Sequence, residues 1–293
     1  MISRSVITAA LIGIVVTGLI PVVAGLVLLA VHKIKASSFW AGVLAFVIAI
    51  VTASVISGII SAAVMMSSMK NGTTDIMNAA IDENSTLTAA LQILIGVVIA
   101  LAMAICVGKC MKTRTFNAAL SCGLGFGISY LVTAAMSFFS SYSTFSMINN
   151  GSFDSRYTDM VSNGFITKEA VNALKETFTA MTAGDILFSI VLSIAVALLM
   201  TAGTVFIMRG VCIKKAFAGI GISLVLFAAQ FGIIGFVSNT AAASIVAAAI
   251  GAAALIFALR MGKDIVPPEK PSYANDSFMQ SIENAKSETD GEQ

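Results

Sequence analysis

The charged residues and the single histidine, which could carry acid–base or metal chemistry, lie outside the most apolar parts of this chain. The sequence has 17 Lys and Arg, 15 Asp and Glu, four cysteines and a single histidine, His32. Seven stretches contain no charged residue and no histidine: 6–31, 39–66, 87–108, 116–139, 186–208, 216–237 and 241–259. Proton transfer or metal-assisted hydrolysis would need such groups. The sequence therefore predicts no catalytic residue and no cofactor within these stretches.

The cysteines are the remaining residues that could bind a metal. Cys106, Cys110 and Cys212 lie at the ends of apolar stretches, and Cys122 lies within the fourth. Cys106 and Cys110 share one face of a helix, but no third or fourth thiol or histidine stands nearby in the sequence, as a structural zinc site requires. We therefore expect thiols at helix ends and no metal site.

The elements that must position these residues are membrane-spanning helices. Each apolar stretch holds at least 19 residues, and about 20 are needed to cross a bilayer as a helix. The chain is 58% hydrophobic and 11% charged, whereas soluble proteins average about 25% charged residues. This pattern predicts an all-α transmembrane bundle of about seven spans, with the lipid bilayer as its partner. A net charge of +2 implies no nucleic-acid partner.

The positions of Lys and Arg predict the orientation. With seven spans, 12 of the 17 basic residues fall on one side, which the positive-inside rule assigns to the cytoplasm. The N-terminus is then outside and the C-terminus inside. We expect residues 1–264 to form the transmembrane domain, and the Pro-, Ser- and Glu-containing segment 265–293 to be a disordered cytoplasmic tail.

The longest connection, 140–185, falls on the outer side. Residues 140–165 are rich in Ser, Asn, Gly and Tyr, so we expect them to be irregular. Thr167 suits a helix N-cap, and an amphipathic helix follows it, which would lie over the outer ends of the spans. A shorter amphipathic helix is expected within 67–86.

Weakly polar and small residues within the spans are the remaining candidates for a site. They are candidates either for a groove or for helix packing, because small residues let backbones approach closely. Pro21 should also kink the first span. The candidate residues are Asn117, Gly123, Gly125, Phe126, Gly127 and Tyr130 in the fourth span, Gln92 in the third and Gln230 in the sixth.

The order of these features resembles a known family. A first span containing Pro21 and ending in His-Lys-Ile-Lys at 32–35 is followed by Phe-Trp-Ala-Gly-Val-Leu-Ala-Phe at 39–46 and by Gly-Leu-Gly-Phe-Gly-Ile at 123–128. This combination is similar to the YhfC-type intramembrane proteases of Gram-positive bacteria. The resemblance in sequence covers spans one to four. For the remaining spans, only the number of spans is similar. The resemblance implies a bacterial cytoplasmic membrane protein.

The resemblance also implies a lost active site. The family carries a glutamate pair near an arginine in its third span and a Gly-x-Gly-His-Gly-Gly-x-Glu motif in the next. In this sequence the histidine of that motif would fall at Phe126 and its glutamate at Tyr130, and the stretch 87–108 contains no acid. The resemblance thus implies a catalytically inactive member, a pseudoprotease.

Two functions follow from these observations. The first is a non-catalytic protein that binds or regulates a membrane protein partner, with the glycine-rich fourth span as the docking groove and 140–185 as its cover. The second is a permease or channel-like subunit for a neutral or hydrophobic solute. The sequence contains no inverted repeat and no nucleotide-binding motif, features that would support the transport function.

Overall fold

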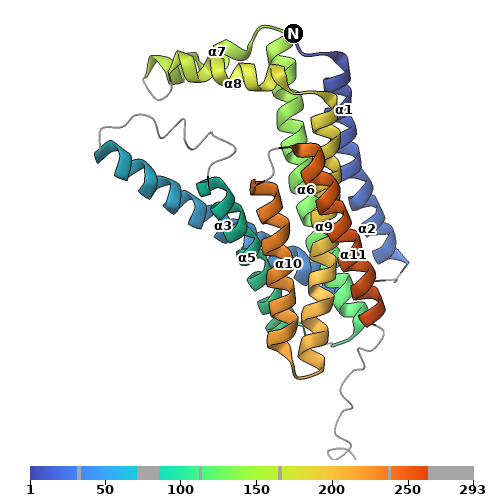
Figure 1. Ribbon diagram of the computed structural model, residues 1–293. Helices are drawn as coiled ribbons and strands as arrows, with labels where there is room; N and C mark the ends of the chain where they lie inside the picture. Colours follow the sequence, from blue (N-terminus) through green and yellow to red (C-terminus); the bar gives the residue numbers. More distant parts are fainter. Residues whose placement is uncertain (32–33, 71–85, 112–113, 164–166, 237–238, 263–293) are drawn as a thin grey trace, which may run out of the picture.

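The computed structural model is a bundle of helices (Figure 1). It describes residues 1–31, 34–70, 86–111, 114–163, 167–236 and 239–262, and within these ranges there is no β-strand, so the all-α prediction is confirmed. The predicted tail and the predicted helix within 67–86 lie almost wholly outside the described residues. The helices are α1 (Arg4–Ile14), α2 (Ile20–Ala30), α3 (Ala36–Lys70), α5 (Thr86–Ile105), α6 (Phe116–Asn149), α7 (Phe153–Ser162), α8 (Lys168–Ala180), α9 (Ala183–Cys212), α10 (Ala216–Phe236) and α11 (Thr240–Gly262).

Six helical segments in the described part of the chain are long and apolar enough to cross a membrane. They are Arg4–Ala30, which joins α1 and α2, together with segments of α3, α6, α9, α10 and α11. The third predicted span forms α5, but its described apolar part, Gln92–Gly108, is shorter than the other six. A helix of this length extends about 26 Å, against about 30 Å for a hydrocarbon core. The lengths and compositions are those of a multi-pass membrane protein.

The first span contains a wide turn in place of a simple proline kink. Residues Val15–Leu19 form a π-helical turn immediately before Pro21. Proline lacks an N–H group and its ring crowds the carbonyl four residues earlier, and a π turn changes the hydrogen-bond spacing at that point. The buried Thr17 hydroxyl donates to the Gly13 carbonyl of α1 over 2.7 Å, so this side chain within the turn is satisfied by a backbone acceptor.

The centre of the bundle is α9. It packs against α6, α10 and α11, and α3 lies on the other side of α6 (Figure 1). From Ala195 to Met208 nearly every residue of α9 is buried. Helices α1 and α2 are much more exposed along their length, as expected for helices at the edge of a bundle in lipid. Helix α3 contacts α6 and α5 and, in Figure 1, diverges from the rest of the bundle.

The expectation that residues 140–165 are irregular is wrong. Helix α6 continues to Asn149, a length of 34 residues, and α7 follows at Phe153. The hydroxyls of Ser141 and Thr144 donate to carbonyls four residues earlier, so these residues do not interrupt the helix. Phe145 is fully buried in a cluster with residues of α1 and α9, and this tertiary packing outweighs the low helix propensity of the segment.

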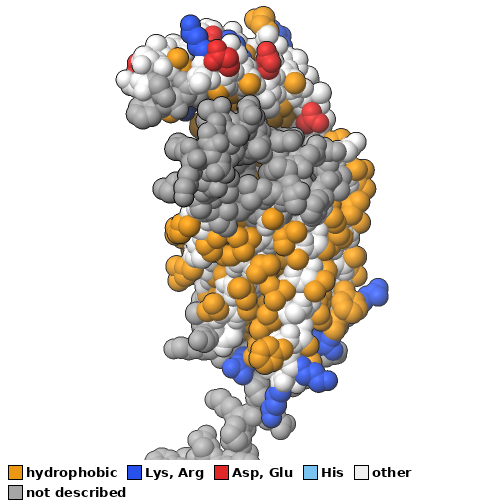
Figure 2. Space-filling model, turned by 60° about the vertical axis from the view of Figure 1, so that its left-hand side comes forward, with side chains coloured by type: hydrophobic (Ala, Val, Ile, Leu, Met, Phe, Trp, Pro, Cys, Tyr) orange, Lys and Arg blue, Asp and Glu red, His pale blue; other side chains and the backbone are white. Residues whose placement is uncertain are grey.

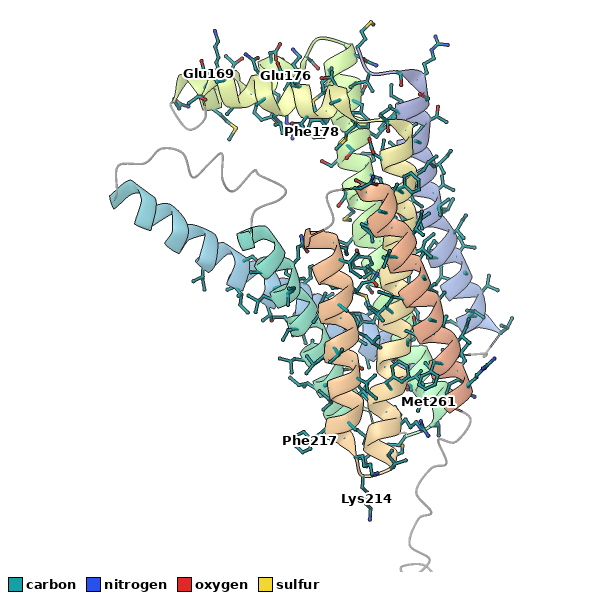
Figure 3. The ribbon with its side chains drawn as sticks, in the orientation of Figure 1. Glu169, Glu176, Phe178, Lys214, Phe217 and Met261 are labelled. Carbon is teal, nitrogen blue, oxygen red and sulfur yellow. The ribbon has the colours of Figure 1, made fainter. Side chains whose placement is uncertain are left out.

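A helical hairpin, α7 and α8, lies across one end of the bundle (Figure 3). As predicted, Thr167 caps α8 by accepting a hydrogen bond from the Ala170 N–H. Phe178 points from α8 toward the bundle, where its ring lies 6.0 Å from that of Phe145, whereas Glu169 and Glu176 point away. The chain terminus is held at the same end, because Asn149 exchanges hydrogen bonds with the backbone of Ile2.

Charges are separated along the long axis of the molecule (Figure 2). The α7–α8 end carries both acidic and basic residues, including Asp154, which forms a 2.8 Å ion pair with Lys175. The opposite end carries Lys and Arg, and a broad hydrophobic surface lies between the two ends. This distribution is typical of a protein embedded in a bilayer.

Candidate functional site

The glycines of α6 lie at contacts with two different helices. A side chain at Gly123 would lie 2.8 Å from the Cα of Thr201, and one at Gly127 would lie 2.9 Å from the carbonyl oxygen of Ala197. Both neighbours belong to α9. The face of α6 that carries Gly123 and Gly127 is therefore covered by the central helix of the bundle.

Gly125 faces α3. A side chain there would overlap the carbonyl oxygen of Phe39, and one at Gly42 of α3 would overlap the carbonyl oxygen of Cys122. The two helices thus place a glycine against each other's backbone. Phe126, between the two glycine faces, is fully buried, and its ring lies edge-on to that of Phe46 at 5.4 Å.

Hydroxyl groups in the core bridge neighbouring helices. Thr204 donates to the Ala119 carbonyl over 3.1 Å, and Thr201 donates to the Gly123 carbonyl over 3.3 Å. In the same way Ser223 donates to Gly203 and Ser244 to Phe188. These hydroxyls are buried and satisfied by backbone acceptors, so they join helices together and do not line an aqueous route.

The other polar candidates are spread over the bundle. Asn117 is exposed in the first turn of α6, Tyr130 is partly buried with its ring 6.4 Å from that of Phe46, and Gln92 is partly buried in α5. Gln230 is fully buried, yet within the described chain neither its Oε1 nor its Nε2 has a hydrogen-bond partner. Among the described residues, Gln230 therefore makes no hydrogen bond across helices.

Two cysteines distant in sequence meet in the core. The Sγ atoms of Cys106 and Cys122 are 3.8 Å apart, and Cys106 Sγ also lies 3.4 Å from the carbonyl oxygen of Ala41. The contact joins the end of α5 to α6 and α3. Sequence reasoning considered Cys106 with Cys110 because they are neighbours on one helix. No local pattern pairs Cys106 with Cys122.

A groove lies between α3 and α5 with a volume of about 370 Å³. Its α3 wall includes Ala41, Ala45 and Ala49, which are spaced four residues apart along one face of the helix. The lining is almost entirely aliphatic, with the Thr52 hydroxyl and the Cys106 thiol as its polar side-chain groups. Both helices are uncharged along the groove. The lining residues are Ala41, Leu44, Ala45, Ile48, Ala49, Thr52, Ile56, Val98, Leu101, Ala102, Ile105 and Cys106.

Among the described residues, no three His, Cys, Asp or Glu side chains gather as ligands of a metal ion. The predicted candidates make helix contacts at Gly123, Gly125, Phe126 and Gly127, and no hydrogen bond among described residues joins Asn117, Tyr130, Gln92 and Gln230 to one another. Comparison with protein-family models, curated proteins and solved structures finds no match to this chain.

Proposed function

We propose that this protein is a catalytically inactive, multi-pass protein of the bacterial cytoplasmic membrane that binds a transmembrane segment of a partner protein. In this proposal α5 is a seventh crossing, and the end that carries Lys214 (Figure 3) faces the cytoplasm, together with Arg114 just before α6 and Arg260 in the last turn of α11. The α7–α8 hairpin and the N-terminus then lie outside, with the C-terminal end of α11 inside.

The proposed loss of catalysis rests on what occupies the positions expected from the YhfC-type resemblance. Phe126 and Tyr130 stand where that family has a histidine and a glutamate. Both rings pack edge-on against Phe46 of α3, at 5.4 and 6.4 Å. Polarising a peptide bond requires a metal ion or a carboxylate with water, and aromatic rings supply neither.

The observation that carries the proposed binding role is the groove between α3 and α5. A docking helix needs an apolar surface that the protein's own helices leave uncovered, and small residues that allow close approach. Helix α3 supplies both: Leu44 and Ile48 are exposed on the rim, and Ala45 and Ala49 form the wall. The glycine-rich faces of α6 cannot take this role because α9 and α3 already cover them.

The permease alternative finds less support in the packing. Transport of a solute needs a pathway or cavity at the middle of the membrane, lined by groups that hold the solute. In the described chain, α9 is buried almost throughout its inner half, and its Thr201 and Thr204 hydroxyls are bonded to backbone carbonyls. No specific observation favours transport.

Photocross-linking tests the proposed docking surface. A photoreactive phenylalanine is placed singly at Ile48 of α3 or Leu101 of α5, which line the groove, and is irradiated in native membranes. The controls are Ile256 of α11 and Val225 of α10, whose exposed fractions of 55% and 69% match or exceed the 54% and 46% of the groove positions. We expect one discrete adduct from the groove positions, at least about fivefold stronger than from the controls. Equal labelling at all four positions would refute docking in the groove.

A further inference from the structure

The turn between α9 and α10 is short, basic and exposed. The apolar spans on either side of it end at Cys212 and begin at Ala216, so only residues 213–215 separate them. These residues include Lys214 and Lys215, and both lysines are exposed. So short a connection cannot extend away from the membrane surface, and it therefore holds the two lysines at the depth of the lipid headgroups.

The backbone at Lys214 has a conformation that normally belongs to glycine. Its φ is +58°, and among the described residues it is the only non-glycine residue with a positive φ. The Lys214 N–H donates to the Val211 carbonyl over 3.3 Å. The Lys215 N–H donates to the Gly210 carbonyl over 2.8 Å. These two bonds form the Schellman motif that ends α9, where glycine is preferred because a side chain is strained in the left-handed region. A lysine at this position costs folding free energy, which a function for its charge would explain.

The positive charge of the turn is held in place and is not neutralised within the described chain. A side chain at Gly210 of α9 would lie 2.9 Å from the Cα of Gly219 of α10, so the two helices pack closely beside the turn and fix its position. Every described Asp and Glu residue lies between 154 and 185, at the α7–α8 end or at the start of α9. Among the described residues, neither lysine of the turn forms an ion pair.

Phe217 gives the same turn an apolar side. It is the second residue of α10, and its side chain is 92% exposed. Ile213, at the other end of the turn, is 50% exposed. In Figure 3, Lys214 points away from the end of the bundle and Phe217 points to its side. At a bilayer surface an aromatic ring packs on the acyl chains, and a lysine extends its ammonium group to the phosphates.

We propose that the turn and the start of α10 bind an anionic phospholipid. The ammonium groups of Lys214 and Lys215 contact its phosphate, and Phe217 packs on its acyl chains. A zwitterionic headgroup carries an amine that the lysines repel, so the turn selects lipids with a net negative charge. In the orientation proposed above, this lipid belongs to the cytoplasmic leaflet. The site is separate from the groove between α3 and α5.

Fluorescence quenching in nanodiscs tests this proposal with the full-length protein. Trp40 is the only tryptophan, so Trp40→Phe combined with Phe217→Trp places a single fluorophore at the site. The bilayer contains equal amounts of an anionic and a zwitterionic phospholipid, and one or the other carries bromine quenchers on its acyl chains. Each lysine near an anionic lipid favours binding about fivefold, so we expect the anionic lipid to be enriched at least about fivefold at position 217. Equal quenching by the two brominated lipids would overturn the proposal.

Lys214→Gly removes the charge and the backbone strain together. In the sensor protein it should lower the enrichment of anionic lipid at least about threefold, and it should unfold at a temperature equal to or above that of its parent, because glycine suits the left-handed position. The control is Lys168→Gln, which removes one exposed positive charge at the opposite end, on α8, and should leave the enrichment unchanged. Unchanged enrichment in Lys214→Gly, or an equal loss in Lys168→Gln, would contradict the proposal.

An acidic protein segment is the alternative occupant of this turn. Residues 264–293 of the chain contain seven Asp and Glu and two Lys, and they follow α11, which ends at Gly262. A carbodiimide, which joins amines to carboxylates, distinguishes the two occupants. In nanodiscs that contain anionic lipid, we expect no cross-link from Lys214 or Lys215 to this segment. A cross-link of the same yield in anionic and in zwitterionic nanodiscs would assign the turn to the acidic segment and refute lipid binding.

Discussion

Replacing Gly42 by alanine is expected to destabilise the protein by about 2–3 kcal/mol or more, although alanine is the better helix former. A methyl group at this position would overlap the carbonyl oxygen of Cys122 and lie 3.0 Å from the Phe126 nitrogen. These are backbone atoms of α6, so no side-chain rotation relieves the overlap, and α3 must move away from α6. The free energy of unfolding, measured by denaturant titration in mixed micelles, tests this result.

Gly58 provides a matched control on the same helix. A methyl group there would meet no atom within 4 Å. Gly58→Ala should therefore be neutral or should stabilise α3 by about 0.5–1 kcal/mol, the usual gain from alanine in a helix. If Gly42→Ala and Gly58→Ala had the same effect, the close approach of α3 and α6 would be wrong.

Replacing Gln230 by methionine is expected to stabilise the protein by about 1–3 kcal/mol. The Gln230 side chain is fully buried, and both of its amide atoms lack a hydrogen-bond partner in the described chain. Methionine has a similar length and removes the cost of burying unpaired polar atoms. The same unfolding titration measures the change.

Gln92→Met is the control for Gln230→Met. Gln92 is only partly buried and its amide atoms are not among the buried unpaired groups of the described chain, so its replacement should change the unfolding free energy by less than about 0.5 kcal/mol. A clear loss of stability in Gln230→Met would mean that Gln230 has a partner in the folded protein, and that this part of the core is polar.

The secondary structure followed closely from the apolar stretches. The predicted span 116–139 begins where α6 begins, at Phe116, and the predicted span 216–237 matches α10 within a residue. The helix ends that the apolar stretches did not predict depend on tertiary contacts. Phe145 keeps α6 helical beyond residue 139 by packing in the core with α1 and α9, and no local pattern of hydrophobicity contains that information.

The candidate site was predictable only in part for the same reason. The spacing of Gly123 and Gly127 indicates a close helix contact, but the residues they meet on α9, Thr201 and Ala197, lie 78 and 70 residues further along the chain. The Gly125 contact with α3 and the Cys106–Cys122 contact each join residues whose proximity depends on how several helices cross. Crossing geometry depends on the whole set of side chains at each contact, which a single helix does not contain.

The central claim, binding of a membrane partner without cleavage, is tested most directly by the mass of the captured partner. The adduct formed from the photoreactive group at Ile48 is isolated from native membranes. Mass spectrometry of the partner's peptides then shows whether both ends of the partner chain are present. We predict an intact partner whose cross-linked residue lies within a transmembrane segment. A partner truncated within that segment, in adducts collected at short irradiation times, would show that the protein cuts what it binds and would contradict the proposed pseudoprotease.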